Sequence, residues 1–218
     1  MGLIKILVAG AASNCGKTAM CEILLRHLTS FAALKVTRVT EETNGCPRGG
    51  RSCGVCSSLG SDYELIVEPQ TLFVEGTDTD RFHKAGACSV AWVVARSSGM
   101  ARAWQDAEAL FSGLSGVVIE SNSILPPSEC TLSMIVVDPS SRLRWKPSVY
   151  ALVPKVDVVI VNIRNSCSPR RLTSVLSELS SLRGVDDLLV VNDLYITLSH
   201  PKVFGLLSLV TTSAFPFD

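Results

Sequence analysis

A short segment near the beginning of the chain combines the residue types that bind phosphate groups. Gly16, Lys17 and Thr18 follow a run of small residues that begins at Ala11. In such a loop the main-chain amides point inward, the lysine reaches the β- and γ-phosphates of a nucleotide, and the Thr hydroxyl binds Mg²⁺. Ala11, after Gly10, replaces the usual first glycine and is small enough for the loop. We therefore expect a nucleoside triphosphate to bind on Ala12, Ser13, Asn14, Cys15, Gly16, Lys17 and Thr18.

The alternative to a phosphate loop is a chance Gly-Lys-Thr at the start of a helix. An apolar run over residues 3–9 leads into the segment, and an amphipathic run follows it. A strand, a loop and a helix in this order are what a phosphate loop requires, so this context favours phosphate binding.

Two carboxylates are candidates for holding magnesium or positioning the attacking water. Glu120 ends the apolar run of residues 117–119, which predicts a strand whose carboxyl end meets the ligand. Asp78 lies in a polar segment, residues 75–81, which we expect to form a turn. Either could instead be a solvated surface carboxylate, an alternative that is weaker for Glu120 because its apolar approach predicts the sheet edge. Lys17, Glu120 and Asp78 are thus the expected catalytic residues.

Recognition of the nucleotide base is less well defined. Asn162 follows an apolar run of residues 158–161, and its side-chain amide could hold a purine edge. The guanine-specific pattern Asn-Lys-x-Asp is altered, because Arg164 and Asn165 replace its Lys and Asp. Adenine therefore becomes possible, so GTP and ATP both stay open. Equally, Asn162 could simply cap the end of a strand.

Three of the eight cysteines, Cys46, Cys53 and Cys56, lie within eleven residues of a Gly-rich and Ser-rich stretch. A Cys-x₂-Cys pair with a third thiolate fits zinc or an iron–sulfur cluster, with a fourth ligand from Cys130, another chain or water. The alternative is a flexible loop with redox-reactive thiols. We expect residues 41–60 to be a metal-binding insertion, because the stretch is too long for an ordinary connection.

The rest of the chain supplies the elements that position these groups. Short apolar runs alternate with helix-period segments, which predicts an α/β fold with a mostly parallel sheet flanked by helices. We expect one domain over residues 1–218. The expected strands are residues 3–9, 34–40, 63–67, 88–94, 116–120, 132–138, 157–162 and 188–192.

Three helices are expected from the spacing of apolar residues. The first carries Met20, Ile23, Leu24, Leu28 and Phe31 on one face, and the second carries Met100, Ala103, Trp104, Ala107, Leu110 and Phe111. The third begins with Ser168 as N-cap and Pro169 as its first residue, and it carries Leu172, Val175, Leu176, Leu179 and Leu182.

Composition excludes several classes of protein. The formal net charge is zero and 47% of residues are hydrophobic, so neither a basic nucleic-acid-binding surface nor a disordered chain is indicated. No run of eighteen apolar residues occurs, so no membrane span is expected. We expect a cytoplasmic protein.

The loop with residues 13–18, together with residues 76–87, resembles the family of molybdopterin-guanine dinucleotide biosynthesis protein B. The second segment contains Asp78, Thr79 and Arg81 and ends in Ala-Gly-Ala. The resemblance covers about the first 125 residues. It implies a GTP-binding P-loop protein of the branch that holds nickel-insertion GTPases, nucleotide-dependent homodimers, and Asp78, Thr79 and Arg81 at the nucleotide or partner site. The Cys-rich insertion is a departure from the family pattern.

Three hypotheses of function follow. The first is an accessory protein for the assembly of a metallocofactor similar to the molybdenum cofactor. It binds and slowly hydrolyses a nucleotide, and it carries zinc or an iron–sulfur cluster on Cys46, Cys53 and Cys56. The second is an ATP-dependent small-molecule kinase or ligase with a structural zinc loop. The third is a non-catalytic scaffold that responds to nucleotide or metal.

Overall fold

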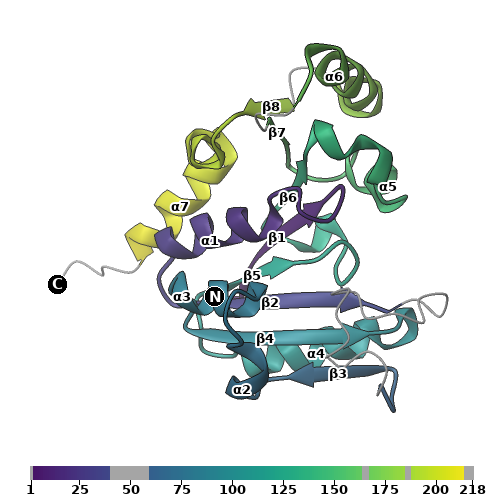
Figure 1. Cartoon of the computed structure of the whole chain (residues 1–218). Helices are drawn as coiled ribbons and strands as arrows, with labels where there is room; N and C mark the ends of the chain where they lie inside the picture. Colours follow the sequence, from purple (N-terminus) through teal and green to yellow (C-terminus); the bar gives the residue numbers. More distant parts are fainter. Residues whose placement is uncertain (1, 40–58, 164–166, 185–187, 214–218) are drawn as a thin grey trace.

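The computed structural model describes residues 2–39, 59–163, 167–184 and 188–213. Within these ranges the chain forms one eight-stranded sheet with helices on both faces (Figure 1). The strands are β1 (Ile4–Gly10), β2 (Phe31–Arg38), β3 (Tyr63–Ile66), β4 (Ser89–Ala95), β5 (Gly116–Glu120), β6 (Leu132–Val137), β7 (Val158–Asn162) and β8 (Leu188–Val191). The α-helices are α1 (Lys17–His27), α2 (Pro69–Leu72), α3 (Asp78–Lys84), α4 (Met100–Leu110), α5 (Ser148–Leu152), α6 (Pro169–Arg183) and α7 (Pro201–Ser213). Four 3₁₀ segments are η1 (Ser97–Gly99), η2 (Pro127–Glu129), η3 (Pro139–Arg144) and η4 (Leu194–Ser199).

The sheet order is β3-β4-β2-β5-β1-β6-β7-β8, and every neighbouring pair is parallel except β3 with β4. The expected α/β class with a mostly parallel sheet flanked by helices is therefore confirmed. Strand β1 lies between β5 and β6. The loop that follows β1 thus emerges at the carboxyl edge of the sheet, where ligands of such folds bind.

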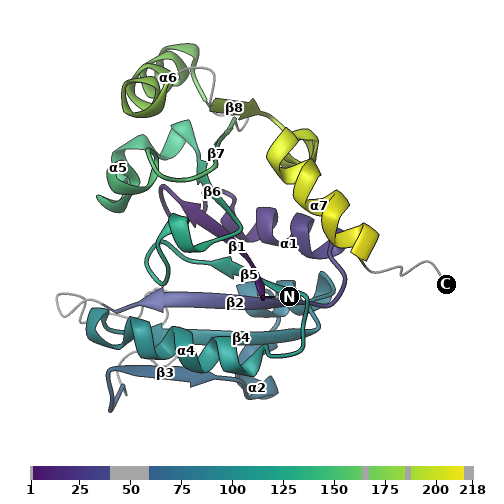
Figure 2. The ribbon, with the colours of Figure 1, turned by 180° about the vertical axis from the view of Figure 1, so that it is seen from behind.

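Alternate side chains of β1 show how the two faces are filled. Ile6 and Val8 belong to a cluster with α1, α3 and α7, whereas Leu7 packs with α4 on the opposite face. Ala9 lies on that second face too, in a cluster with α5 and α6. Figures 1 and 2, seen from opposite sides, show α1 and α7 in front of the sheet in one view and α4 in front in the other. Because both faces are covered, the central strands are apolar almost throughout.

All eight expected strands are present, each within a few residues of its expected bounds. Two apolar residues were placed wrongly. Phe31 begins β2 and does not belong to the first helix, which ends at His27, and Leu110 at the end of α4 is exposed. The N-cap Ser168 is confirmed, since its side chain accepts from the Arg171 amide. Helix α7 was not among the expected elements.

The expected turn around Asp78 is also wrong, because Asp78 begins the helix α3. Thr77 is its N-cap and accepts from the Asp80 amide at 3.3 Å, while the Asp80 carboxylate accepts from the Gly76 amide at 2.9 Å. This reciprocal arrangement satisfies two amides at the helix start. Asp78 is thereby held in the first turn of a capped helix.

Candidate functional site

The loop between β1 and α1 has the backbone geometry that an anion cradle needs. Gly16 adopts φ +115°, and a Cβ there would lie 2.8 Å from Asn162 Nδ2, so only glycine fits. A Cβ on Gly10 would lie 2.5 Å from Cγ and Cδ of Lys17. Gly10 therefore leaves room for the stem of Lys17 to lie against the start of the loop.

The amino terminus of α1 is open toward this loop. The first helical hydrogen bond is donated by the Met20 amide to Gly16 O, and no side chain caps the helix. No acidic residue lies in its first turn. The Lys17 ammonium folds back over the loop and donates to Ala12 O at 3.1 Å. Unpaired amides, a helix amino terminus and a lysine charge together favour a bound polyanion.

Thr18, Asp78 and Glu120 meet beside this loop. Thr18 Oγ1 lies 2.9 Å from Asp78 Oδ1 and 3.0 Å from Glu120 Oε2. A hydroxyl has one proton, so Thr18 can donate to only one of the two carboxylates at a time. Three oxygen atoms, one from each of these residues, thus lie close together with one hydroxyl proton between them. Mg²⁺ is a hard dication that binds oxygen ligands, so it is a suitable ion for this group of atoms. Among the described residues no group of three His, Cys, Asp or Glu side chains is placed to hold a metal.

Lys35 is a member of this cluster that the sequence analysis missed. Its Nζ lies 2.6 Å from Asp78 Oδ2 and 2.6 Å from Glu120 Oε1. Lys35 and Glu120 are paired in the register of β2 and β5, which sets their side chains next to each other. Each carboxylate therefore gives one oxygen to Lys35 and turns the other toward Thr18. The same two carboxylates can therefore contact the Lys35 ammonium and a dication bound at Thr18 at the same time.

The ionisation states follow from these contacts. Burial raises the pKa of Asp78, but the charge and hydrogen bond of Lys35 outweigh it and hold the pKa below its ordinary value. Burial lowers the pKa of Lys35, but Glu120 and then Asp78 reverse this and raise it. At neutral pH Asp78 is therefore ionised and Lys35 is charged.

A second polar contact fixes the start of the loop. Asn122 Oδ1 accepts from the Gly10 amide at 3.0 Å, and Asn122 Nδ2 donates to Gly10 O at 2.8 Å. One side-chain amide thus satisfies both backbone groups of Gly10. Sequence reasoning did not single out Asn122, because an asparagine two residues after a strand is a common turn residue.

The two other residues that the family resemblance places at the nucleotide or partner site make contacts within the protein. Thr79 is buried, and its hydroxyl donates to Leu72 O. Arg81 forms a bidentate ion pair with Glu22 of α1, with Nε–Oε1 at 3.1 Å and Nη2–Oε2 at 2.6 Å. This pair joins α3 to α1, and so connects the helix that carries Asp78 to the helix that carries Thr18.

Asn162 contacts the loop itself. Its Nδ2 donates to Cys15 O at 3.1 Å, and the residue is buried. The amide nitrogen is thus used by the loop backbone in this structure, which gives no preference between guanine and adenine. Cys46, Cys53 and Cys56 lie outside the described residues. The five described cysteines are free thiols, and burial raises the pKa of Cys130 to about 11.

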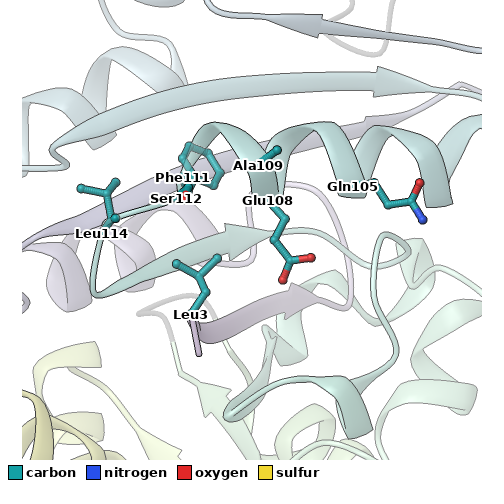
Figure 3. Close-up of a pocket in the computed structure, with 8 residues that line it drawn as sticks. Leu3, Gln105, Glu108, Ala109, Phe111, Ser112 and Leu114 are labelled. Carbon is teal, nitrogen blue, oxygen red and sulfur yellow. The ribbon is translucent and has the colours of Figure 1, made fainter. Parts of the chain in front are cut away.

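A hollow at the opposite edge of the sheet does not have this chemistry. It is lined by Leu3 before β1, by the second half of α4 and by the segment before β5 (Figure 3). Its charged group is Glu108, which pairs with Lys5 at 2.6 Å. A carboxylate and apolar side chains do not favour phosphate, so this hollow is no alternative to the loop.

No family model matches the chain, and no curated protein matches it. Among solved structures, the chain is similar to that of HypB from Helicobacter pylori in complex with nickel, at 14% identity and a TM-score of 0.46, covering 100% of this chain and 91% of that chain. A likeness at this level carries no argument for function. Within the described ranges, no helix is long and apolar enough to cross a bilayer.

Proposed function

We propose that this chain binds a nucleoside triphosphate with Mg²⁺ on the loop of residues 10–18 and hydrolyses it slowly. The observation that carries the proposal is Thr18 Oγ1 set between two carboxylate oxygens beside an uncapped helix amino terminus. The amides of residues 12–18 surround the β-phosphate, and Lys17 exchanges its bond to Ala12 O for the β- and γ-phosphates.

Thr18, Asp78 and Glu120 are the residues that would hold the metal. When bound, Mg²⁺ offsets charge on the β- and γ-phosphates and fixes their orientation. Lys35 orients both carboxylates, because it takes the oxygens that face away from Thr18, and it lowers the pKa of Asp78. Asp78 connects this metal site to α3, so loss of the terminal phosphate would change the contacts of that helix.

The finer part of the proposal is an accessory role in metallocofactor assembly. It is supported by the resemblance of residues 13–18 and 76–87 to a molybdenum-cofactor family and by the spacing of Cys46, Cys53 and Cys56. These thiolates would hold zinc or an iron–sulfur cluster, and the protein would act as a homodimer toward a client metalloenzyme or cofactor-assembly protein.

Calorimetric titration with ATP and with GTP tests nucleotide binding. A charge-assisted hydrogen bond contributes about 1.5–3 kcal/mol, so Lys17→Ala is expected to weaken binding about 10- to 100-fold. The matched control is Lys155→Ala, which removes an exposed lysine of the same size. Equal affinities of Lys17→Ala and the parent protein for both nucleotides would contradict the proposal. Hydrolysis that needs an added small acceptor would favour a kinase or ligase instead.

Anaerobic purification with elemental analysis and a visible spectrum tests the metal site. Cys46→Ser is expected to reduce bound zinc or iron, whereas Cys88→Ser, at an exposed free thiol, should not. A metal-free parent protein that Cys46→Ser leaves unchanged would remove the support for a role in metallocofactor assembly, while nucleotide binding would stand.

A further inference from the structure

Lys146 lies on the rim of the phosphate loop, in the segment between η3 and α5. Its backbone amide donates to Ala11 O at 2.8 Å. Ala11 in turn donates to Val136 O of β6 at 2.9 Å, so the loop start is held on the β6 side of β1. This is the side away from β5, the strand that carries Glu120.

Asn122 reinforces this placement. The same Nδ2 that donates to Gly10 O lies 3.1 Å from Ser148 Oγ. Gly10 and Ser148 are thus bridged by one side chain, and Lys146 is bonded to the residue that follows Gly10. The segment of residues 146–148 is fixed against the loop by two independent contacts.

Lys146 is exposed as a residue, and its ammonium lies within electrostatic reach of the site lysines. Partial desolvation lowers the pKa of this ammonium, and the charge of Lys17 and then that of Lys35 lower it further, against the opposing effects of Cys15 and Glu120. Among the residues that the structure describes, none forms an ion pair with Lys146. Three ammonium groups that repel one another form a favourable site for an anion placed between them.

The position along the loop identifies which anion. Lys17 crosses the loop to reach Ala12 O, so its ammonium already lies over the Ala11–Ala12 end. In a phosphate loop that lysine reaches the β- and γ-phosphates, whereas the helix amino terminus takes the phosphates nearer the nucleoside. A cation anchored at Ala11 therefore stands at the end of the loop where the terminal phosphate lies.

We infer that Lys146 binds the γ-phosphate of the nucleotide from the β6 side, opposite the metal cluster of Thr18, Asp78 and Glu120. This rests on the proposed function, since it presupposes a nucleotide on the loop. Lys146 distinguishes a triphosphate from a diphosphate, because its partner is the group that hydrolysis removes.

The test compares affinities for AMP-PNP and ADP, and for GMP-PNP and GDP, with Mg²⁺ present. Lys146→Ala is expected to weaken binding of the triphosphate analogue about tenfold or more and to leave diphosphate binding unchanged. Lys146→Arg, which keeps the charge, should retain most of the preference. Lys155→Ala is the matched control and should behave as the parent protein.

A Lys146→Ala variant whose ratio of triphosphate to diphosphate affinity equals that of the parent protein would overturn the inference, whether both affinities fall or neither does. Unchanged diphosphate binding also shows that the variant is folded, and Lys146→Gln replaces it if Lys146→Ala does not fold. Lys17→Ala separates the two proposals. If it fails to weaken either nucleotide, the proposed function fails; if it weakens them and Lys146→Ala leaves the ratio unchanged, only the inference about Lys146 fails.

Discussion

Replacement of Lys35 by methionine tests the charge balance of the candidate metal site. The side chains of Lys35 and Glu120 are 16% and 2% exposed, so their ion pair is nearly buried. Removing one partner of a buried ion pair costs about 3–5 kcal/mol, because the other charge stays buried without compensation. Asp78, at 34% exposure, can be partly solvated, so we expect the lower end, about 3 kcal/mol.

Urea unfolding in EDTA measures this loss directly. Thermal unfolding gives the same loss on a temperature scale. For a chain of this length a stability change of 1 kcal/mol corresponds to about 2–4 °C in the thermal midpoint, so Lys35→Met should lower that midpoint by about 6–12 °C. The matched control is Lys202→Met, because the Lys202–Asp157 pair, at 3.4 Å, is largely exposed and should contribute less than about 1 kcal/mol.

Magnesium supplies the second half of the test. With Lys35 gone, Asp78 and Glu120 face Thr18 without the ammonium that contacts both, so Mg²⁺ with AMP-PNP or GMP-PNP should restore more stability to Lys35→Met than to the parent protein. A Lys35→Met variant as stable in EDTA as Lys202→Met, and no more responsive to Mg²⁺, would refute the electrostatic reasoning.

Three further predictions concern the surroundings of this cluster. Lys35 holds the Asp78 pKa below 3.8 against the effect of burial, so ionised Asp78 stabilises the fold above that pH, and this contribution is lost as the pH falls toward the lowered pKa. In urea unfolding at a series of acidic pH values, Asp78→Asn should therefore lose less stability with falling pH than the parent protein. An equal loss of stability in both proteins would contradict this. Arg81→Ala should raise the Mg²⁺ concentration needed for nucleotide binding several-fold, while the affinity for nucleotide in EDTA changes little. The double variant Glu22→Arg with Arg81→Glu, which exchanges the two charges, should recover part of the lost affinity. Equal losses of nucleotide affinity with and without Mg²⁺ would argue against a positioning role for Arg81. Asn122→Ala leaves the Gly10 amide without its side-chain partner and should destabilise the fold by about 1–3 kcal/mol by urea unfolding, so a loss below about 0.5 kcal/mol would show that water replaces the contact.

The sequence allowed prediction of what depends on neighbours along the chain. Each strand was identified from its apolar run, and the phosphate loop from a pattern of consecutive residues. Glu120 was found because the end of a strand is a local feature, and Asp78 because it lies in a conspicuous polar segment. Helix α3 was taken for a turn because seven residues are too few for a clear helical period.

Contacts between distant elements could not be predicted in this way. Lys35 reaches Glu120 only because β2 and β5 are neighbours in a particular register, and this is not evident from either strand alone. Asn122 and Lys146 lie on the loop for the same reason, through the strand order β5-β1-β6. Arg81 was assigned to the nucleotide site by resemblance, whereas its distance to Glu22 is set by the packing of α3 on α1.

In the proposed complex, main-chain amides of the loop surround the phosphates of a nucleotide. Amide ¹H–¹⁵N spectra recorded with Mg²⁺ and AMP-PNP or GMP-PNP test this residue by residue. The claim predicts that the largest shifts fall on the amides of Asn14, Cys15, Gly16, Lys17 and Thr18, and that Lys17→Ala reduces them at the same nucleotide concentration. Largest shifts outside residues 10–20, for instance around Glu108 and Leu114 at the opposite edge of the sheet, would contradict it.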